Sequence, residues 1–285
     1  MQRVFIVGCP RSGTTLVQAL LARHPAVYSF PETAFFEAVL GGLETRWHDP
    51  EARRDVRWYH RRGIAHSRGR RYLRQLESHL SDTAPRNSQP HLVRSCIRRY
   101  LELLDDAAAR HGCTTWVEKT PNHLVYIDDI ARHVPDALFI HVLRNGEDVV
   151  ASIVDADITQ PTGAFRGGVR RWVRRWNYAV GVQVSCLADS RHHGICLEDM
   201  VENFDQEWDK LRAFLHLDAT AALAAEPKCM IADLAEEPWK NQALSGVIAP
   251  PMHKAERVFG PRIRDWVQSS LLPYEAIRAK IAQGG

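Results

Sequence analysis

The sequence predicts an α/β fold, with a parallel sheet flanked by helices in a single domain. Residues 4–7 are four consecutive apolar residues of buried-strand character, and a glycine-bounded loop leads from them into a helix-compatible run at 16–23. Two further strand-like segments, at 114–118 and 137–143, are each followed by a loop and a helical pattern. Alternating strands and helices are typical of a parallel sheet, and 285 residues are enough for one large domain.

The loop between Gly8 and Gly13 predicts a phosphate cradle. Backbone N–H groups of such a loop and of the next helical turn converge on one spot, where the helix dipole also stabilises a phosphoryl or sulfuryl group. The fold is therefore P-loop-like, but Thr14 and Thr15 follow Gly13 where nucleotide hydrolases have Lys and then Ser or Thr. Arg11, inside the loop, supplies a cation instead. We expect the ligand to be a nucleotide.

The composition, with 45% hydrophobic and 25% charged residues, excludes disordered and fibrous classes. The net charge of +3 is too small to indicate nucleic-acid binding, but it is compatible with a polyanionic cosubstrate. The N-terminal apolar run is only strand-length and Pro10 interrupts it, so we expect no membrane span and a cytoplasmic protein. The six cysteines form no Cys-x-x-Cys pair, and His192 and His193 are expected in a solvated turn. We therefore expect no disulfide framework and no metal site.

Glu32 lies between a short predicted strand, which Pro31 ends, and a helical pattern that begins at Ala34. Ligands of open α/β sheets bind at the carboxyl ends of the strands, so this carboxylate is expected to face the same cleft as the glycine loop. An acid at the start of a helix is also favoured by the helix dipole alone. Position in the sequence leaves both interpretations open.

Lys119 and Arg144 each stand at the end of a predicted strand. At such a mouth, Lys119 can stabilise the negative charge that develops on a leaving oxygen. Arg144 can make a bidentate contact with a phosphate, to which Ser152, on the following helix, adds a directed hydroxyl donor. His141, inside the strand before Arg144, is expected in the core.

Residues 34–112 are mostly helical in pattern, with interleaved arginine and aromatic residues, and are expected to form an insertion between two sheet strands. Insertions at strand ends shape binding pockets, so we expect this one to select the second substrate. Within it, residues 81–90 contain two prolines and are expected to form a mobile loop.

Two pairs in the second half of the chain are expected to be structural. Trp172 and Trp176 lie one turn apart in a predicted helix and are expected to pack in the core, with the neighbouring arginines in solvent. Glu198 and Asp199 follow a short predicted strand at 194–197 and are expected to cap and orient the next helix.

Three segments resemble the sulfotransferases that use 3'-phosphoadenosine 5'-phosphosulfate (PAPS). They are Pro-Arg-Ser-Gly-Thr-Thr at 10–15, Glu-Lys-Thr-Pro at 118–121 and an Arg-x-x-x-Asp-x-x-x-Ser arrangement at 144–152. The resemblance covers about residues 4–217, and it implies that the first segment binds the 5'-phosphosulfate, Lys119 the sulfonate and the third segment the 3'-phosphate. The implied donor-binding residues are Arg11, Ser12, Gly13, Thr14, Thr15, Arg144 and Ser152. A looser resemblance adds Trp239, stacking on adenine, and Lys240, pairing with a phosphate.

A narrower resemblance implies the general base. Cytosolic sulfotransferases have a catalytic His directly after Lys-Thr, where this chain has Pro121. The spacing from Arg11 to Glu32 and the Pro-Glu-Thr context are similar to those of tyrosylprotein sulfotransferases and bacterial relatives. This similarity implies Glu32 as the base, with Lys119 and Arg11 as charge-stabilising groups. His123 is the alternative base, although we expect it on a surface helix.

The sequence thus predicts a sulfotransferase that moves a sulfonate group from PAPS to an acceptor hydroxyl by in-line displacement, releasing adenosine 3',5'-bisphosphate without a metal. A hydroxyl-bearing small molecule, a sugar and a tyrosine peptide all remain open as acceptors, and the Arg-rich insertion favours an acidic one. A small-molecule kinase of P-loop type, with Glu198 and Asp199 binding the metal, is an alternative that the missing loop lysine disfavours. A nucleotide-binding module without catalysis is a second alternative, disfavoured by the presence of Glu32 and Lys119.

Overall fold

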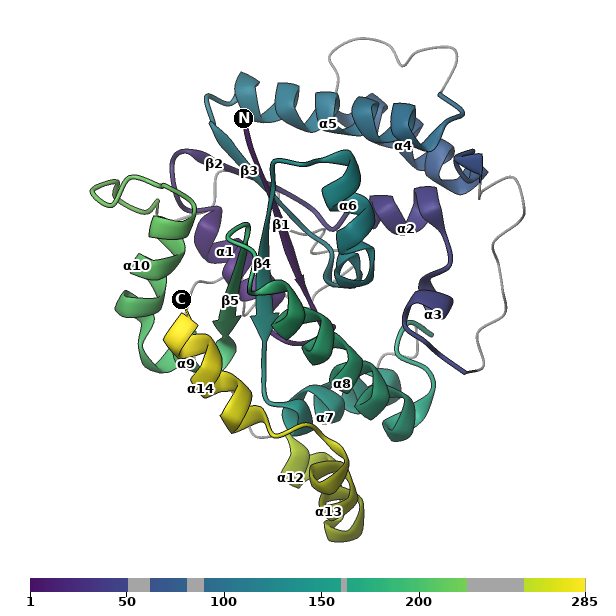
Figure 1. Ribbon diagram of the computed structural model, residues 1–285, viewed down its shortest axis with the longest axis vertical. Helices are drawn as coiled ribbons and strands as arrows, with labels where there is room; N and C mark the ends of the chain where they lie inside the picture. Colours follow the sequence, from purple (N-terminus) through teal and green to yellow (C-terminus); the bar gives the residue numbers. More distant parts are fainter. Residues whose placement is uncertain (51–61, 81–89, 160–162, 225–253, 285) are drawn as a thin grey trace.

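The computed structural model describes residues 1–50, 62–80, 90–159, 163–224 and 254–284. Within these residues, five strands form one parallel sheet in the order β2-β3-β1-β4-β5 (Figure 1). The strands are β1 Gln2–Gly8, β2 Val27–Phe30, β3 Thr115–Lys119, β4 Ala137–Leu143 and β5 His192–Cys196. The expected α/β class with a parallel sheet flanked by helices is therefore confirmed.

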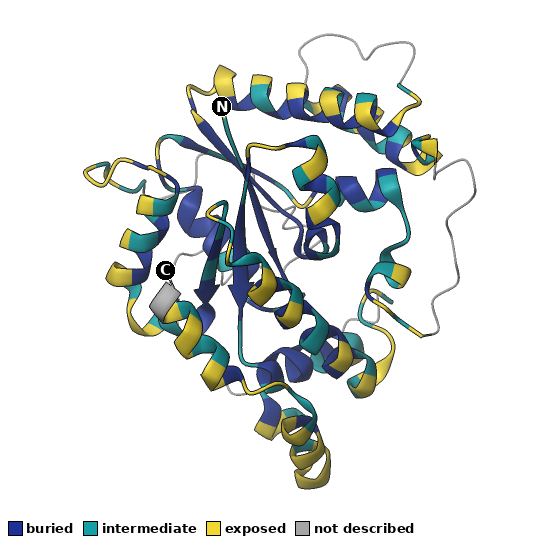
Figure 2. Cartoon of the chain, in the orientation of Figure 1, coloured by how far each residue is buried: buried dark blue, intermediate teal, exposed yellow. Residues whose placement is uncertain are grey.

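Strand β1 lies at the centre of the sheet and contributes to a core on each face. Side chains alternate along a strand, so Phe5 and Val7 point to one face while Val4 and Ile6 point to the other. All four side chains are fully buried, and Figure 2 shows the strands as the buried centre of the molecule with the exposed residues on the outer faces of the helices. A strand buried on both faces explains the unbroken apolar run in the sequence.

Different helices cover the two faces of the sheet. Helix α1 Thr14–Leu21 and helix α10 Phe204–Phe214 supply the core around Val4 and Ile6. The core around Phe5 and Val7 includes residues of the long helices α5 Val93–Arg110, α7 Gly146–Thr159 and α8 Gly168–Cys186. Outside the segment between β2 and β3, the other described helices are η2 Pro121–Tyr126, α6 Ile127–His133, α9 Leu197–Glu202, α12 Ala255–Val258, α13 Pro261–Ser270 and α14 Tyr274–Gly284.

The expected helical insertion lies between β2 and β3. Its helices are α2 Phe35–Leu40, α3 Leu43–Arg46, α4 Ser67–Leu80 and α5 Val93–Arg110. Residues 51–61, which carry several of its arginines, and residues 81–89 of the expected mobile loop lie outside the described residues. Among the helices that are described, none combines the length and the apolar character that crossing a bilayer requires.

Two expectations about polar side chains were wrong. His192 and His193 are the first residues of β5 rather than a solvated turn, because the His192 ring stacks on Phe139 of the neighbouring strand and His193 stacks on Phe214. Arg175, beside the buried Trp172 and Trp176, is itself only 5% exposed. Its guanidinium forms an ion pair with Glu44, and the resulting charge compensation permits its burial.

Candidate active site

The glycine loop, residues 9–13, joins the carboxyl end of β1 to α1. A Cβ on Gly8 would lie 2.5 Å from the carbonyl oxygen of Val142, and a Cβ on Gly13 would lie 2.6 Å from Leu197 Cδ1. Gly13 also has a φ of 95°, a conformation that residues with a side chain disfavour. Both glycines therefore permit the close approach of this loop to β4 and α9.

Arg11 connects the glycine loop to the end of β4 and to α7. Its Nε donates to Ser152 Oγ at 3.2 Å, across 141 residues of sequence. Its carbonyl oxygen accepts a hydrogen bond of 3.4 Å from Arg144 Nη1, across 133 residues. Three residues that the sequence assigns to the two ends of the donor thus meet beside one another, and Arg11 itself has the left-handed φ of 71°.

The turn after β4 is fixed by its own Asn145 and by contacts from Trp176 of α8 and from Lys254. Asn145 Oδ1 accepts two N–H groups of the first turn of α7, at 3.0 and 3.4 Å, so it caps this helix. The Trp176 indole donates to the Arg144 carbonyl oxygen at 3.1 Å. Asp148, the acid of the Arg-x-x-x-Asp-x-x-x-Ser arrangement, accepts from the Lys254 N–H at 2.9 Å and lies 3.9 Å from the Arg144 guanidinium. These contacts hold Arg144 at the carboxyl end of β4.

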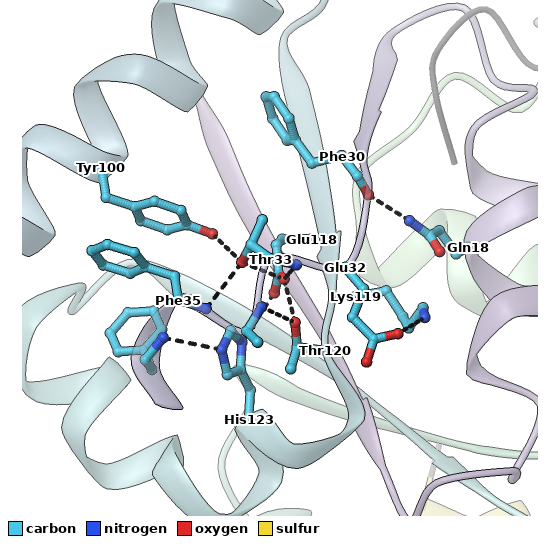
Figure 3. Close-up of polar contacts among 12 residues, drawn as sticks. Gln18, Phe30, Glu32, Thr33, Phe35, Tyr100, Glu118, Lys119, Thr120 and His123 are labelled. Atoms are coloured by element: carbon cyan, nitrogen blue, oxygen red, sulfur yellow. Dashed lines mark hydrogen bonds and ion pairs between the residues drawn. The ribbon is translucent and has the colours of Figure 1, made fainter. Parts of the chain in front are cut away.

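Glu32 and Lys119 form an ion pair at the same edge of the sheet. Lys119 ends β3, Glu32 follows the adjacent strand β2, and Lys119 Nζ lies 2.5 Å from Glu32 Oε2 (Figure 3). The lysine side chain is 2% exposed, whereas the glutamate side chain is 35% exposed. Ile6 of β1 pairs with Lys119, so the ion pair sits beside the strand that leads into the glycine loop. A buried cation thus holds a carboxylate that solvent and a substrate can reach.

Glu118, the residue before Lys119, is fully buried and has four hydrogen-bond donors around it. It accepts from Thr33 N at 3.0 Å, Thr33 Oγ1 at 2.7 Å, Thr120 Oγ1 at 2.5 Å and His123 Nδ1 at 3.0 Å. Burial acts to raise the pKa of Glu118, but the coulombic attraction of His123 and the hydrogen bonds from His123, Thr120 and Thr33 outweigh it, and the pKa lies below its ordinary value. The site therefore contains a second, buried carboxylate charge.

His123 is fully buried, so the expectation of a surface helix was wrong. Its Nδ1 faces Glu118, and its Nε2 accepts from the Phe36 N–H at 3.3 Å. Both ring nitrogens of His123 thus have partners within the protein.

Comparison with known families identifies relatives of the chain. The model of the Sulfotransferase family matches residues 3–221, which contain the glycine loop, Glu32, Lys119 and Arg144. The chain belongs to the sulfotransferase family. The resemblance in the three sequence segments is therefore confirmed at the level of the family.

Relatives of this sulfotransferase-family chain include enzymes of animals. It is 26% identical over 221 residues to "Protein-tyrosine sulfotransferase" of Drosophila melanogaster, covering 75% of this chain and 38% of that protein. It is 27% identical over 218 residues to "Protein-tyrosine sulfotransferase 2" of Gallus gallus, covering 75% of this chain and 51% of that protein. The chain spans about half the length of these relatives or less.

A solved structure supports the fold. The "Sulfotransferase Domain from the Curacin Biosynthetic Pathway" matches with a TM-score of 0.52 and 15% sequence identity, covering 99% of this chain and 97% of that domain. At this identity the likeness concerns the arrangement of strands and helices.

Glu198 and Asp199 were expected to cap and orient the helix that follows them. In the structure of this sulfotransferase-family chain, their side chains instead bind residues outside that helix. Glu198 Oε1 accepts from the Asn145 N–H at 3.0 Å, and its other oxygen accepts from the Tyr274 hydroxyl. Asp199 accepts from Arg278 Nη2 at 2.6 Å. This acidic pair therefore joins the turn at the end of β4 to α14. No motif in the sequence marks Tyr274 or Arg278, which lie more than 70 residues away.

Three residues of potential metal-ligand type gather on β4, α8 and β5, and not at the glycine loop. The ligand atoms of His141, Cys186 and His192 lie within 4.8 Å of one another. His141 is buried as expected, and its Nε2 lies 2.8 Å from His192 Nδ1. Two imidazoles on one tetrahedral zinc stand about 3.3 Å apart, given Zn–N distances of about 2.0 Å. The observed separation is that of a hydrogen bond between two rings.

Trp239 and Lys240, the loosest donor-binding predictions, lie outside the described residues. The predicted donor-binding residues that the structure describes lie in the glycine loop, at the start of α1, directly after β4 and on α7.

Proposed function

We propose that the protein transfers a sulfonate group from PAPS to an acceptor hydroxyl. The observation that carries this proposal is the Glu32–Lys119 ion pair of 2.5 Å, at the sheet edge where a sulfotransferase-family chain carries its glycine loop. A base and a buried cation side by side are the two groups that such a transfer needs.

The donor lies along the edge formed by β1 and β4. Residues 11–15, from Arg11 to Thr15, surround the 5'-phosphosulfate with backbone N–H groups and one guanidinium. Arg144 and Ser152 bind the 3'-phosphate, for which a guanidinium and a hydroxyl are suited. The contacts among Arg11, Arg144 and Ser152 support this arrangement, because one anionic molecule can engage all three.

The reaction is an in-line displacement at sulfur. The acceptor oxygen forms a bond to sulfur while the bond from sulfur to the bridging oxygen of PAPS breaks, leaving adenosine 3',5'-bisphosphate. Glu32 takes the proton of the acceptor hydroxyl. Lys119 and Arg11 stabilise the negative charge on the bridging oxygen and the sulfonate. In this scheme side chains and loop N–H groups supply the positive charge, and no step uses a metal ion.

The acceptor carries a hydroxyl and is a small molecule, a sugar or a tyrosine peptide. The relatives named protein-tyrosine sulfotransferase favour the tyrosine peptide. The arginines of the insertion at 34–112 favour an acidic sequence around that tyrosine.

The proposal is tested by incubating the protein with PAPS and a panel of acceptors comprising phenols, sugars and acidic tyrosine peptides. We expect one acceptor class to gain the mass of one sulfonate group. A parallel incubation with ATP and magnesium tests phosphoryl transfer. Transfer from ATP without any binding of adenosine 3',5'-bisphosphate would replace the proposal with a kinase activity.

A further inference from the structure

Glu118 is hydrogen-bonded to Thr33, which follows Glu32, and to Thr120, which follows Lys119. It precedes Lys119 in β3, and its oxygens accept two hydrogen bonds from Thr33, which follows Glu32 (Figure 3). The mechanism gives this carboxylate no chemical step, and it is fully buried. A buried charge is costly unless it is bound, so its presence beside the base calls for a reason.

The backbone N–H groups that follow Glu32 are hydrogen-bonded to Glu118, either directly or through one side chain. The N–H groups of residues 33–36 stand at the start of α2, where helical partners are missing. One donates to Glu118 directly, and each of the other three donates to a side chain that is itself bonded to Glu118. The four contacts are Thr33 N to Glu118 at 3.0 Å, Ala34 N to Thr120 at 3.0 Å, Phe35 N to the Thr33 hydroxyl at 3.3 Å and Phe36 N to His123 at 3.3 Å.

The negative charge of Glu118 sets the direction of this network. An ionised carboxylate only accepts hydrogen bonds, so the hydroxyls of Thr33 and Thr120 donate to it. Their lone pairs then face the N–H groups of α2. The Tyr100 hydroxyl, 3.1 Å from Thr33 Oγ1, is consequently the donor in that contact. Helix α5 of the insertion is thereby joined to the loop of Glu32.

The loop of Glu32 is held in a conformation that it does not favour by itself. Ala34 has φ 46° and ψ 27°, a left-handed conformation that costs a residue with a Cβ about 1 kcal/mol or more. Such conformations persist where surrounding contacts determine them, and here the Ala34 N–H is bound to Thr120. The sharp turn directly after Glu32 therefore depends on groups that Glu118 orients.

We propose that Glu118 is a positioning residue for sulfonate transfer, an inference that rests on the proposed function. Its charge fixes the loop of Glu32 relative to the end of β3 that carries Lys119, and thereby aims the Glu32 carboxylate at the acceptor hydroxyl. Glu118 contacts neither donor nor acceptor. Since a misplacement of about 1 Å can cost about 100-fold in rate, loss of this charge lowers kcat and leaves donor binding intact.

The test measures kcat, the KM for PAPS, and the Kd for adenosine 3',5'-bisphosphate in Glu118→Gln, Thr33→Val and Thr33→Ser. Gln has the size of Glu but presents an NH2 group to one of the buried donors. Thr33→Val removes only the hydroxyl, and Thr33→Ser restores it. Glu77→Gln is the matched control, because Glu77 is a buried carboxylate of the insertion that pairs with Arg99 at 2.5 Å.

We expect kcat to fall about 10- to 100-fold in Glu118→Gln and Thr33→Val, with Kd within about 2-fold of wild type. Thr33→Ser recovers most of the loss, and Glu77→Gln retains the wild-type kcat. If Glu118→Gln fails to fold, the two Thr33 variants decide. Wild-type kcat in Thr33→Val, equal loss in Thr33→Ser, or a Kd that rises as much as kcat falls would overturn the inference. A wild-type protein that transfers nothing from PAPS would instead refute the proposed function, and this inference with it.

Discussion

Lys119 Nζ contacts Glu32 Oε2 at 2.5 Å across the carboxyl ends of two adjacent parallel strands. Parallel strands bring such ends to one edge of a sheet, so two residues 87 positions apart become partners. The lysine is buried and the glutamate is partly open to solvent. The buried ammonium therefore holds a carboxylate that solvent can reach.

Replacement of Lys119 by Met should lower turnover far more than donor affinity. In the proposed mechanism the ammonium stabilises the charge that develops on the leaving oxygen, and one such group contributes about 100- to 1,000-fold to kcat. Steady-state kinetics with PAPS measure the loss, and titration with adenosine 3',5'-bisphosphate measures affinity. Lys210→Met, at a partly exposed lysine paired with Glu207 on α10, is the control and should keep the wild-type kcat. Equal kcat in the two variants would exclude the role of Lys119.

Arg144→Ala should mainly weaken nucleotide binding. A hydrogen bond to a charged group contributes about 1.5–3 kcal/mol, so the Kd for adenosine 3',5'-bisphosphate should rise about 10- to 100-fold. Calorimetric titration measures this change. Arg132→Ala is the control, because that side chain is 70% exposed on α6. An unchanged Kd in Arg144→Ala would show that the 3'-phosphate lies elsewhere.

Gly13→Ala should weaken nucleotide binding, whereas Gly181→Ala should stabilise the fold. Gly13 has positive φ and no room for a Cβ beside Leu197, so its replacement should distort the glycine loop and weaken nucleotide binding. Gly181 lies inside α8 with no atom within 4 Å of a Cβ, so its replacement should raise the free energy of unfolding by about 0.5–1 kcal/mol. Denaturant unfolding and nucleotide titration of both variants provide the check. Nucleotide affinity unaffected by Gly13→Ala would contradict the account of the loop.

Stability should fall on acidification because of buried histidines in the sheet. Burial, with a smaller contribution from Lys210, lowers the pKa of His193 from 6.5 to about 4. Between these values the unfolded chain binds a proton that the folded chain does not, so stability decreases as pH falls. The loss from one group is at most about 1.4 kcal/mol per pH unit. His193→Phe, which preserves a ring against Phe214, should lose less stability between pH 7 and pH 4.5 in urea unfolding. Parallel pH curves for the two proteins would contradict this pKa shift.

Sequence patterns located the site residues that lie at strand ends. Arg144 could be placed because an apolar run ends directly before it, and Lys119 because it follows the short strand predicted at 114–118. The structure brings both to one edge of the sheet. The burial of His123 could not be foreseen, since its partners Glu118 and the Phe36 N–H come together only in the fold. The same holds for His193, whose partner Phe214 comes from α10. Contacts between distant segments, and not local pattern, decided these cases.

Glu118 illustrates a different limit of the sequence. It stands in the Glu-Lys-Thr-Pro segment, so its position at the site was visible. Its four hydrogen bonds involve Thr33 and His123 as well as its neighbour Thr120, and only the fold assembles them. A glutamate is rarely fully buried unless its carboxylate has partners. A Glu inside a predicted buried strand is therefore the sequence feature that indicates such a carboxylate.

The most direct measurement of the proposed mechanism is turnover of Glu32→Gln at saturating PAPS, set beside its Kd for adenosine 3',5'-bisphosphate. Loss of a general base should lower kcat by about 100- to 10,000-fold, while the Kd stays within about 2-fold of wild type. A Glu32→Gln enzyme that transfers the sulfonate group at the wild-type rate would contradict the assignment of Glu32 as the base.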